Sequence, residues 1–187
     1  MEHFTKTERA HLMNVKTKLV KHFSDMIKQP WWDGGLAIDW TMFYLSGGAI
    51  ASLIQDETPK DWDIYNSSSQ DADLVVEMVK KKTEYIADVD PKYTEVMGVD
   101  GKMITANAIT MKDGTSFITM CGGAPTEVKK TFDYVHCTPH YEILSKLLWI
   151  SPHQYHAARY KKLIVNNPDS IRQYRLDKFL KRGYTKL

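Results

Sequence analysis

The sequence has few cysteines and no long apolar run. Its two cysteines, Cys121 and Cys137, cannot form a disulfide framework, so we expect free thiols in a reducing compartment. No apolar stretch approaches the roughly 20 residues of a membrane span, and the first residues lack the apolar stretch of a secretory signal. Internal repeats and low-complexity segments are also missing. We therefore expect a globular cytoplasmic protein without a membrane partner.

The composition is that of an ordinary folded domain, but the charge is unevenly distributed. The chain has 187 residues, of which 43% are hydrophobic and 26% charged, and its net charge is +2. Residues 159–187 hold nine Lys or Arg and two Asp, a balance of +7, which leaves −5 for the other 158 residues. This basic segment either contacts phosphate or forms a solvated helix face.

Hydrophobic spacing predicts helices that alternate with short strands. Apolar residues from Leu12 to Ile27 recur every three or four positions, which is typical of an amphipathic helix. Runs of β-branched and aromatic residues predict buried strands. Helices are expected over residues 3–29, 49–55, 71–82 and 125–130, and strands over residues 40–45, 62–65, 103–110, 116–120 and 132–137. From residue 141 onward we expect mostly helix.

This order of elements predicts an α+β fold. We expect a small mixed or antiparallel sheet with flanking helices, followed by a helical C-terminal segment. Residues 1–140 would form the main domain, including the N-terminal helix, and residues 141–187 would form a basic helical segment packed on that domain.

The most informative segment joins a Gly-Gly turn to a pair of aspartates. Ser46-Gly47-Gly48 follows a predicted strand, and Asp61-Trp62-Asp63 begins thirteen residues after Gly48. Residues two apart on a strand point to the same side, so both carboxylates would lie close together and favour a bound Mg²⁺ or Mn²⁺. Glycines let a ligand approach the backbone, and free N–H groups at the start of the next helix would accept a phosphate. The pattern predicts metal-assisted phosphoryl or nucleotidyl transfer.

A Gly-Gly turn, a short helix and Asp-x-Asp between apolar residues resemble the signature of the DNA polymerase β-type nucleotidyltransferase superfamily. The resemblance implies a nucleotidyltransferase-like fold in which the Ser46–Gly48 turn holds a nucleoside triphosphate (NTP). It also implies that Asp61 and Asp63 bind a pair of metal ions and that a third carboxylate on a neighbouring strand completes the site. Asp133 is the best match for that carboxylate, because it is a lone acid in a predicted apolar strand.

Residues 125–137 and 174–184 also resemble short nucleotidyltransferase-like proteins of bacteriophages. Together these resemblances imply an enzyme that moves a nucleoside monophosphate from an NTP to a hydroxyl group. An RNA end, a nucleotide or a protein would each fit as acceptor, in the host cytoplasm if the chain is phage-encoded. The alternative is a catalytically silent protein of the same fold that binds a nucleotide or nucleic acid.

The C-terminal basic segment contains the candidate phosphate ligands. Arg175, Lys178 and Arg182 are three or four residues apart and would share one helix face, which either borders the carboxylates or is solvated. Arg172 and Arg175 are the preferred nucleotide-binding candidates, because a guanidinium group binds phosphate through two parallel hydrogen bonds.

Structural alternatives remain open for three of these assignments. Asp61 and Asp63 could form a solvated strand end, and Ser46 could simply end its strand. Asp133 could cap a turn or pair with a C-terminal arginine. Zinc binding near Cys137 is not favoured, because structural zinc sites usually pair two cysteines at close spacing.

Overall fold

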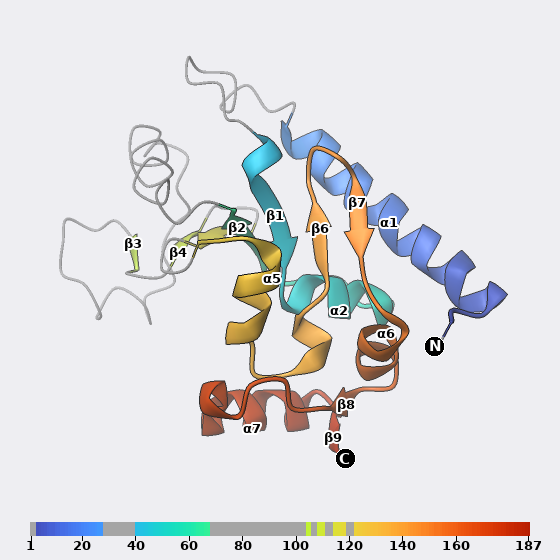
Figure 1. Ribbon diagram of the computed structural model, residues 1–187, viewed down its shortest axis with the longest axis vertical. Helices are drawn as coiled ribbons and strands as arrows, with labels where there is room; N and C mark the ends of the chain where they lie inside the picture. The colour runs from blue at the N-terminus through green and yellow to red at the C-terminus, as the bar shows by residue number, and fades with distance from the viewer. Residues whose placement is uncertain (1–2, 28–39, 68–103, 106–107, 111–113, 119–121) are drawn as a thin grey trace.

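The computed structural model describes residues 3–27, 40–67, 104–105, 108–110, 114–118 and 122–187. They form a sheet with helices packed on it and a further helical layer at one end (Figure 1). The predicted α+β fold is confirmed. No helix within these ranges is long and apolar enough to cross a membrane. The helix predicted over residues 71–82 lies outside the described residues, and so does Cys121.

Over the described residues, the sheet contains seven strands in the order β3-β4-β5-β2-β1-β6-β7. Its centre is the antiparallel pair β1 (Phe43–Ser46) and β2 (Trp62–Asn66). On the far side of β2 lies β5 (Thr115–Ile118), which runs parallel to β2 with Ser116 opposite Asp63. Every other neighbouring pair is antiparallel. The remaining strands are β3 (Ile104–Thr105), β4 (Ala108–Thr110), β6 (His140–Glu142) and β7 (Leu147–Trp149).

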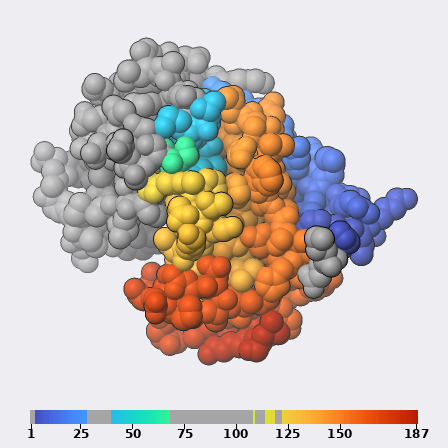
Figure 2. Space-filling model, in the orientation of Figure 1, coloured from blue at the N-terminus to red at the C-terminus, as the bar shows by residue number. Residues whose placement is uncertain are grey.

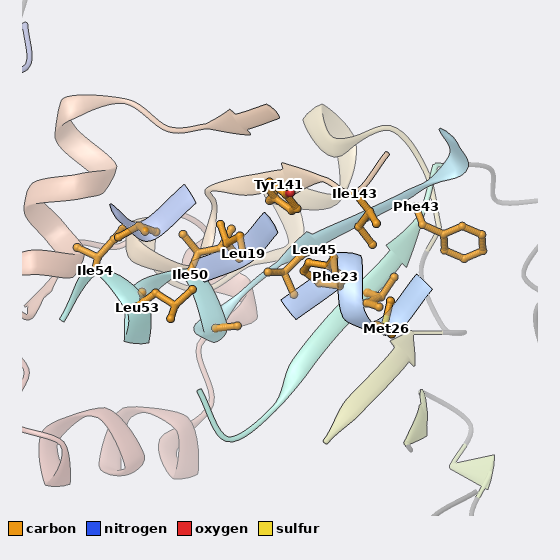
Figure 3. Close-up of a cluster of buried hydrophobic side chains, with 14 of the residues drawn as sticks. Leu19, Phe23, Met26, Phe43, Leu45, Ile50, Leu53, Ile54, Tyr141 and Ile143 are labelled. Carbon is orange, nitrogen blue, oxygen red and sulfur yellow. The ribbon is translucent and has the colours of Figure 1, made fainter. Parts of the chain in front are cut away.

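The main core lies between one face of the sheet and two helices, α1 (Lys6–Ile27) and α2 (Gly48–Ile54). Side chains alternate along a strand, so Phe43 and Leu45 both point into this core. In Figure 3, Leu45 lies among the side chains of both helices, and Phe43 lies at the Met26 end of the cluster. The helical contribution consists of residues at helical spacing, namely Val15, Leu19, Phe23 and Met26 from α1 and Ile50, Leu53 and Ile54 from α2.

The first turns of two helices, α1 and α6 (Pro152–Arg159), are each capped by a pair of residues that exchange side-chain-to-backbone hydrogen bonds. At the start of α1, the Thr5 amide donates to the Glu8 carboxylate at 2.7 Å and the Glu8 amide donates to the Thr5 hydroxyl at 3.2 Å. Ser151 and Gln154 make the same pair of contacts at the start of α6. Each pair satisfies backbone N–H groups that have no partner inside the helix.

The opposite face of the central strands is covered by α5 (Pro125–Val128) and the following 3₁₀-turn η4 (Lys129–Thr131). Tyr44 and Tyr65 stack there with ring centroids 5.7 Å apart, and Val128 packs against them. This packing leads the chain back across the sheet, so that the residues after η4 lie close to the end of β1.

A C-terminal layer is built around a second apolar cluster. It contains the 3₁₀-turn η6 (Pro168–Ser170), α7 (Gln173–Lys181) and the short parallel pair β8 (Lys162–Leu163) and β9 (Thr185–Lys186), whereas α6 contributes Tyr155 and Ala158 to the main core. Figure 2 shows the last residues of this layer as the red end of the molecule, beside the yellow α5 segment. The buried side chains that hold the layer together are Tyr134, Cys137, Leu163, Phe179 and Tyr184.

Two sequence predictions about this half of the chain are wrong. Residues 132–137 do not form a strand: after an isolated bridge at Tyr134, residues Val135–Cys137 form the 3₁₀-turn η5. Tyr134 and Cys137 are buried in the second cluster and Phe132 packs against it, which satisfies the pattern that had suggested a strand. The chain beyond residue 141 is also less helical than expected, because it contains β7, β8 and β9. The division into residues 1–140 and 141–187 stays a prediction; β6 (His140–Glu142) spans the predicted boundary.

Candidate active site

A cleft of about 950 Å³ opens where the end of β1, the start of β2 and α7 meet. It brings together residues that are more than 100 positions apart in the sequence, such as Gly47 and Arg175. Seven of the eight predicted site residues line this cleft, and Ser46 is the exception. The two halves of the predicted site, acidic strand and basic tail, therefore face one common space.

Gly47 forms the turn between β1 and α2 and lies against an acidic side chain. Its backbone has φ +91° and ψ −150°, a conformation that is almost confined to glycine. A Cβ atom added to this residue would lie 3.4 Å from Oδ2 of Asp63. The next residue, Gly48, is different, because a Cβ added there would meet no atom within 4 Å. Gly47 is thus required by the fold, whereas Gly48 leaves its backbone open toward the cleft.

Asp61 and Asp63 lie at the cleft side of β2. Asp61 is exposed just before the strand, and Asp63 is partly buried within it. Burial raises the pKa of Asp63 to about 6, and the negative charge of Asp61 adds to the effect. Lys178 and Arg175 act in the opposite direction but do not cancel it. Two carboxylates in this state favour a bound cation.

Asp133 is engaged by an arginine rather than left free. It is 2% exposed, and its carboxylate forms a two-pronged ion pair with Arg175, with Nε at 2.5 Å from Oδ2 and Nη2 at 3.0 Å from Oδ1. The Tyr134 amide donates a further hydrogen bond of 3.0 Å to Oδ1. Of the alternatives open in the sequence, the structure therefore shows the pairing of Asp133 with a C-terminal arginine.

Ser46 points away from the cleft. It is 2% exposed, and its hydroxyl donates to the carbonyl oxygen of Pro139 at 2.8 Å. This contact ties the end of β1 to the segment before β6. The geometry matches the structural alternative for Ser46, that it ends its strand.

The face of α7 that was predicted to be basic does border the carboxylates. Arg175, Lys178 and Arg182 all line the cleft, as does Arg172 just before the helix. Arg182 is partly occupied, since its Nη2 donates to Glu57 at 2.9 Å and to Ser52 at 3.1 Å. Within the described part of the chain, Arg172 donates to the backbone carbonyl oxygens of Asp169 and Ile171, at 2.8 and 3.3 Å.

Sequence reasoning missed Lys60 and Lys181, which also line the cleft. Lys60 directly precedes Asp61, so a basic residue beside the acidic motif was the available signal. Lys181 lies one turn after Lys178 on α7, and extending the helical spacing by one step would have found it.

Of the three carboxylates predicted to bind metal, Asp133 is paired with Arg175, which leaves Asp61 and Asp63. Among the described residues, no group of three Asp, Glu, His or Cys side chains is arranged to hold a metal ion. The strand next to β2 places Ser116, rather than a carboxylate, opposite Asp63. The zinc site considered near Cys137 is likewise not formed by the described residues.

Residues 14–161 match the family model described as Gabija anti-defense 2 family protein, or Gad2. The chain belongs to the Gad2 family. A search of curated proteins finds no significant match. The match does not bear on the predicted phage origin, which stays a prediction.

The fold is similar to that of CCA-adding enzymes, which are nucleotidyltransferases of the DNA polymerase β-type superfamily. The enzyme of Thermotoga maritima, complexed with tRNA, gives a TM-score of 0.52 at 15% identity, over 94% of this chain and 39% of that one. The enzyme of Bacillus stearothermophilus, in complex with CTP, gives 0.53 at 13% identity, over 85% and 41%. The chain therefore spans about two fifths of the length of these enzymes, and the likeness shows the fold.

Proposed function

We propose that the chain is a metal-dependent nucleotidyltransferase that moves a nucleoside monophosphate from an NTP to a hydroxyl acceptor. The observation that carries the proposal is the cleft in which Asp61 and Asp63 face the cations of α7 across the Gly47 turn. Such a cleft offers carboxylates for metal ions and guanidinium or ammonium groups for phosphates, which is what this chemistry needs.

Asp61 and Asp63 would hold Mg²⁺ or Mn²⁺. Mg²⁺ is usually bound through one or two carboxylates together with substrate phosphates and water, so two aspartates suit it. Burial and the charge of Asp61 raise the pKa of Asp63 although Lys178 and Arg175 oppose them, so a bound cation would offset the cost of ionising this carboxylate. When bound, the metal would neutralise charge that develops on the phosphate during transfer.

The protein's own residues would bind and orient the nucleotide. Gly48 leaves room for the triphosphate to approach the backbone, and Arg172, Arg175 and Lys178 would contact its oxygens. In the reaction, the acceptor oxygen forms a bond to the α-phosphorus and the bond between the α- and β-phosphates breaks. Pyrophosphate leaves, and the proton of the acceptor hydroxyl passes to solvent.

The acceptor would be an RNA end, a nucleotide or a protein. The CTP and tRNA of the structural neighbours support a nucleotide donor and a nucleic-acid acceptor. The description of the Gad2 family as anti-defense supports an acceptor that belongs to a defence system, which would be inactivated by the added nucleotide.

Label transfer tests this function. The protein is incubated with α-phosphate-labelled NTPs, Mg²⁺ or Mn²⁺, and a mixture of cellular RNA and protein. We expect label to enter an acceptor with the wild type and with Asp56→Asn, which changes an aspartate outside the cleft. Asp63→Asn should transfer no label. Equal transfer by Asp63→Asn would remove Asp63 from the site.

A second candidate is a catalytically silent nucleotide-binding protein of the same fold. It is favoured by the finding that, among the described residues, no group of three Asp, Glu, His or Cys side chains is arranged to hold a metal ion. It predicts that NTP raises the melting temperature (Tm) of the wild type while no label enters any acceptor. Nucleotide binding without transfer would therefore select this alternative.

A further inference from the structure

We propose that Asp133 is a positioning residue that holds Arg175 ready for a substrate phosphate, and is not a metal ligand. The inference rests on the proposed function and concerns the same cleft. It replaces the third-carboxylate role that the sequence suggested for Asp133.

The Asp133 carboxylate has little capacity left for a metal ion. Oδ1 accepts hydrogen bonds from the Tyr134 amide and from Nη2 of Arg175, and Oδ2 accepts one from Nε of Arg175. The side chain is 1% exposed. A metal ion would have to displace Arg175 and occupy the place of a cation that is already bonded through two nitrogens.

The ion pair with Asp133 occupies only one edge of the Arg175 guanidinium group. A guanidinium group has two edges that bind an oxyanion, one made by Nε and Nη2 and one made by Nη1 and Nη2. Asp133 takes the first edge. Within the described ranges the structure gives Nη1 no hydrogen-bond partner, and the Arg175 side chain is 32% exposed and lines the cleft. The second edge is therefore available to a phosphate.

Asp133 is itself firmly held, as a positioning residue must be. Its carbonyl oxygen accepts the amides of Asn166 at 2.8 Å and Asn167 at 3.3 Å. The Asn166 side chain donates to the carbonyl oxygen of Phe132 at 2.8 Å. Arg175 also lies 5.6 Å above the ring of Phe179, so the guanidinium is fixed from two sides. A fixed guanidinium loses less side-chain entropy when phosphate binds than a mobile one does.

The test separates nucleotide affinity from metal affinity. Binding of Mn²⁺ alone is titrated by electron paramagnetic resonance, and binding of an NTP analogue with a methylene bridge between the α- and β-phosphates is measured by calorimetry. The variants are Asp133→Asn, Arg175→Ala, their double mutant and Arg175→Lys. Asp56→Asn serves as the matched control, because it breaks an aspartate–arginine pair with Arg159 outside the cleft, and Asp61→Asn serves as the metal-site reference.

Positioning predicts that each single variant weakens analogue binding by about tenfold or more, and that the double mutant is no weaker than Arg175→Ala. Arg175→Lys should also lose affinity although its charge is kept. Mn²⁺ affinity should stay within about twofold of wild type in all of these variants, and only Asp61→Asn should lose it. If Asp133→Asn does not fold, Asp133→Glu, which keeps the carboxylate but shifts it by one methylene, replaces it in both measurements: analogue affinity should still fall and Mn²⁺ affinity should still be kept.

Three results would count against the assignment. Loss of Mn²⁺ affinity in Asp133→Asn, to the level of Asp61→Asn, would make Asp133 a metal ligand. Wild-type analogue affinity in Asp133→Asn or Arg175→Lys would overturn the positioning role alone and leave the proposed function standing. Failure of the wild type to bind the analogue would overturn the proposed function and this assignment together.

Discussion

Asp63 lies directly beside Gly47: a Cβ atom added to the glycine would be 3.4 Å from Oδ2 of the aspartate, an ordinary van der Waals distance. This proximity joins the two motifs that are separated in the sequence by α2. The turn begins with a glycine because its φ of +91° would strain the backbone of a residue that has a side chain.

The two glycines of the turn should therefore respond differently to alanine. Gly47→Ala is expected to lower the free energy of unfolding by roughly 1–3 kcal/mol and to abolish transfer. Gly48→Ala should leave stability within about 0.5 kcal/mol of wild type, because its Cβ meets no neighbour, but should weaken nucleotide binding by projecting into the cleft. Urea unfolding and calorimetric titration measure the two effects. Equal stability of both variants would contradict this reading of the turn.

Asp63→Asn should make the protein more stable while it removes activity. A carboxyl group whose pKa is raised in the folded state, here to about 6 from 3.8, favours the unfolded state once the pH exceeds its unfolded value. The penalty therefore appears as the pH rises from about 4 and is complete above about 6. At neutral pH without metal, we expect Asp63→Asn to gain roughly 1–2 kcal/mol in urea unfolding.

The pH dependence supplies the control for that prediction. The gain should shrink towards pH 4 and vanish below about pH 3, where Asp63 is protonated in both states. A gain of the same size at both pH values would show that it does not come from the buried charge.

His136 should make the fold sensitive to acid. It is fully buried among Tyr134, Phe179 and Tyr184, and burial lowers its pKa to about 3. The cations Arg175 and Arg182 lower it further, and Asp133 opposes them. In the unfolded protein His136 binds a proton below about pH 6.5, whereas in the folded protein it stays neutral there. The free energy of unfolding is therefore retained above about pH 6.5 and falls as the pH drops below it.

The matching variant is His136→Phe, which keeps a ring and cannot be protonated. Its stability should decline less steeply than that of the wild type as the pH falls from about 6.5, with a difference of up to about 1.4 kcal/mol per pH unit. Parallel curves in urea unfolding across this range would show that His136 does not contribute.

Lys178 should contribute to nucleotide affinity through its charge. It lines the cleft, and its charge acts on Asp63. We expect Lys178→Gln to weaken NTP-analogue binding by roughly threefold to tenfold at low salt and by less at high salt. Lys186→Gln, on β9 outside the cleft, is the matched control and should bind as wild type. The same affinity in both variants would exclude Lys178 from the site.

The first half of the site could be predicted because its determinants are local. A buried strand, a Gly-Gly turn, a short helix and Asp-x-Asp follow one another within about two dozen residues, and the structure folds them as β1, α2 and β2. Helical spacing also sufficed to group Arg175, Lys178 and Arg182 on one face of α7.

The sequence left Asp133 open between a metal ligand and a partner of a C-terminal arginine, because the choice depends on tertiary contacts. The apolar residues around it look like a strand, yet the Val135 amide donates to Ile164 and the Cys137 amide to Tyr134, so no sheet ladder forms. Its partner Arg175 lies 42 residues away, and no local pattern indicates that pairing. The short strands β8 and β9, of two residues each, carry too little periodicity to be recognised.

The central claim is that a nucleoside monophosphate is moved and pyrophosphate is released. The most direct measurement compares NTP labelled on the α-phosphate with NTP labelled on the γ-phosphate, using wild type and Asp63→Asn with Mg²⁺. We predict that α-label enters an acceptor, that γ-label is released as pyrophosphate, and that Asp63→Asn does neither. Entry of γ-label into the acceptor, or binding of NTP with no movement of either label, would contradict the account.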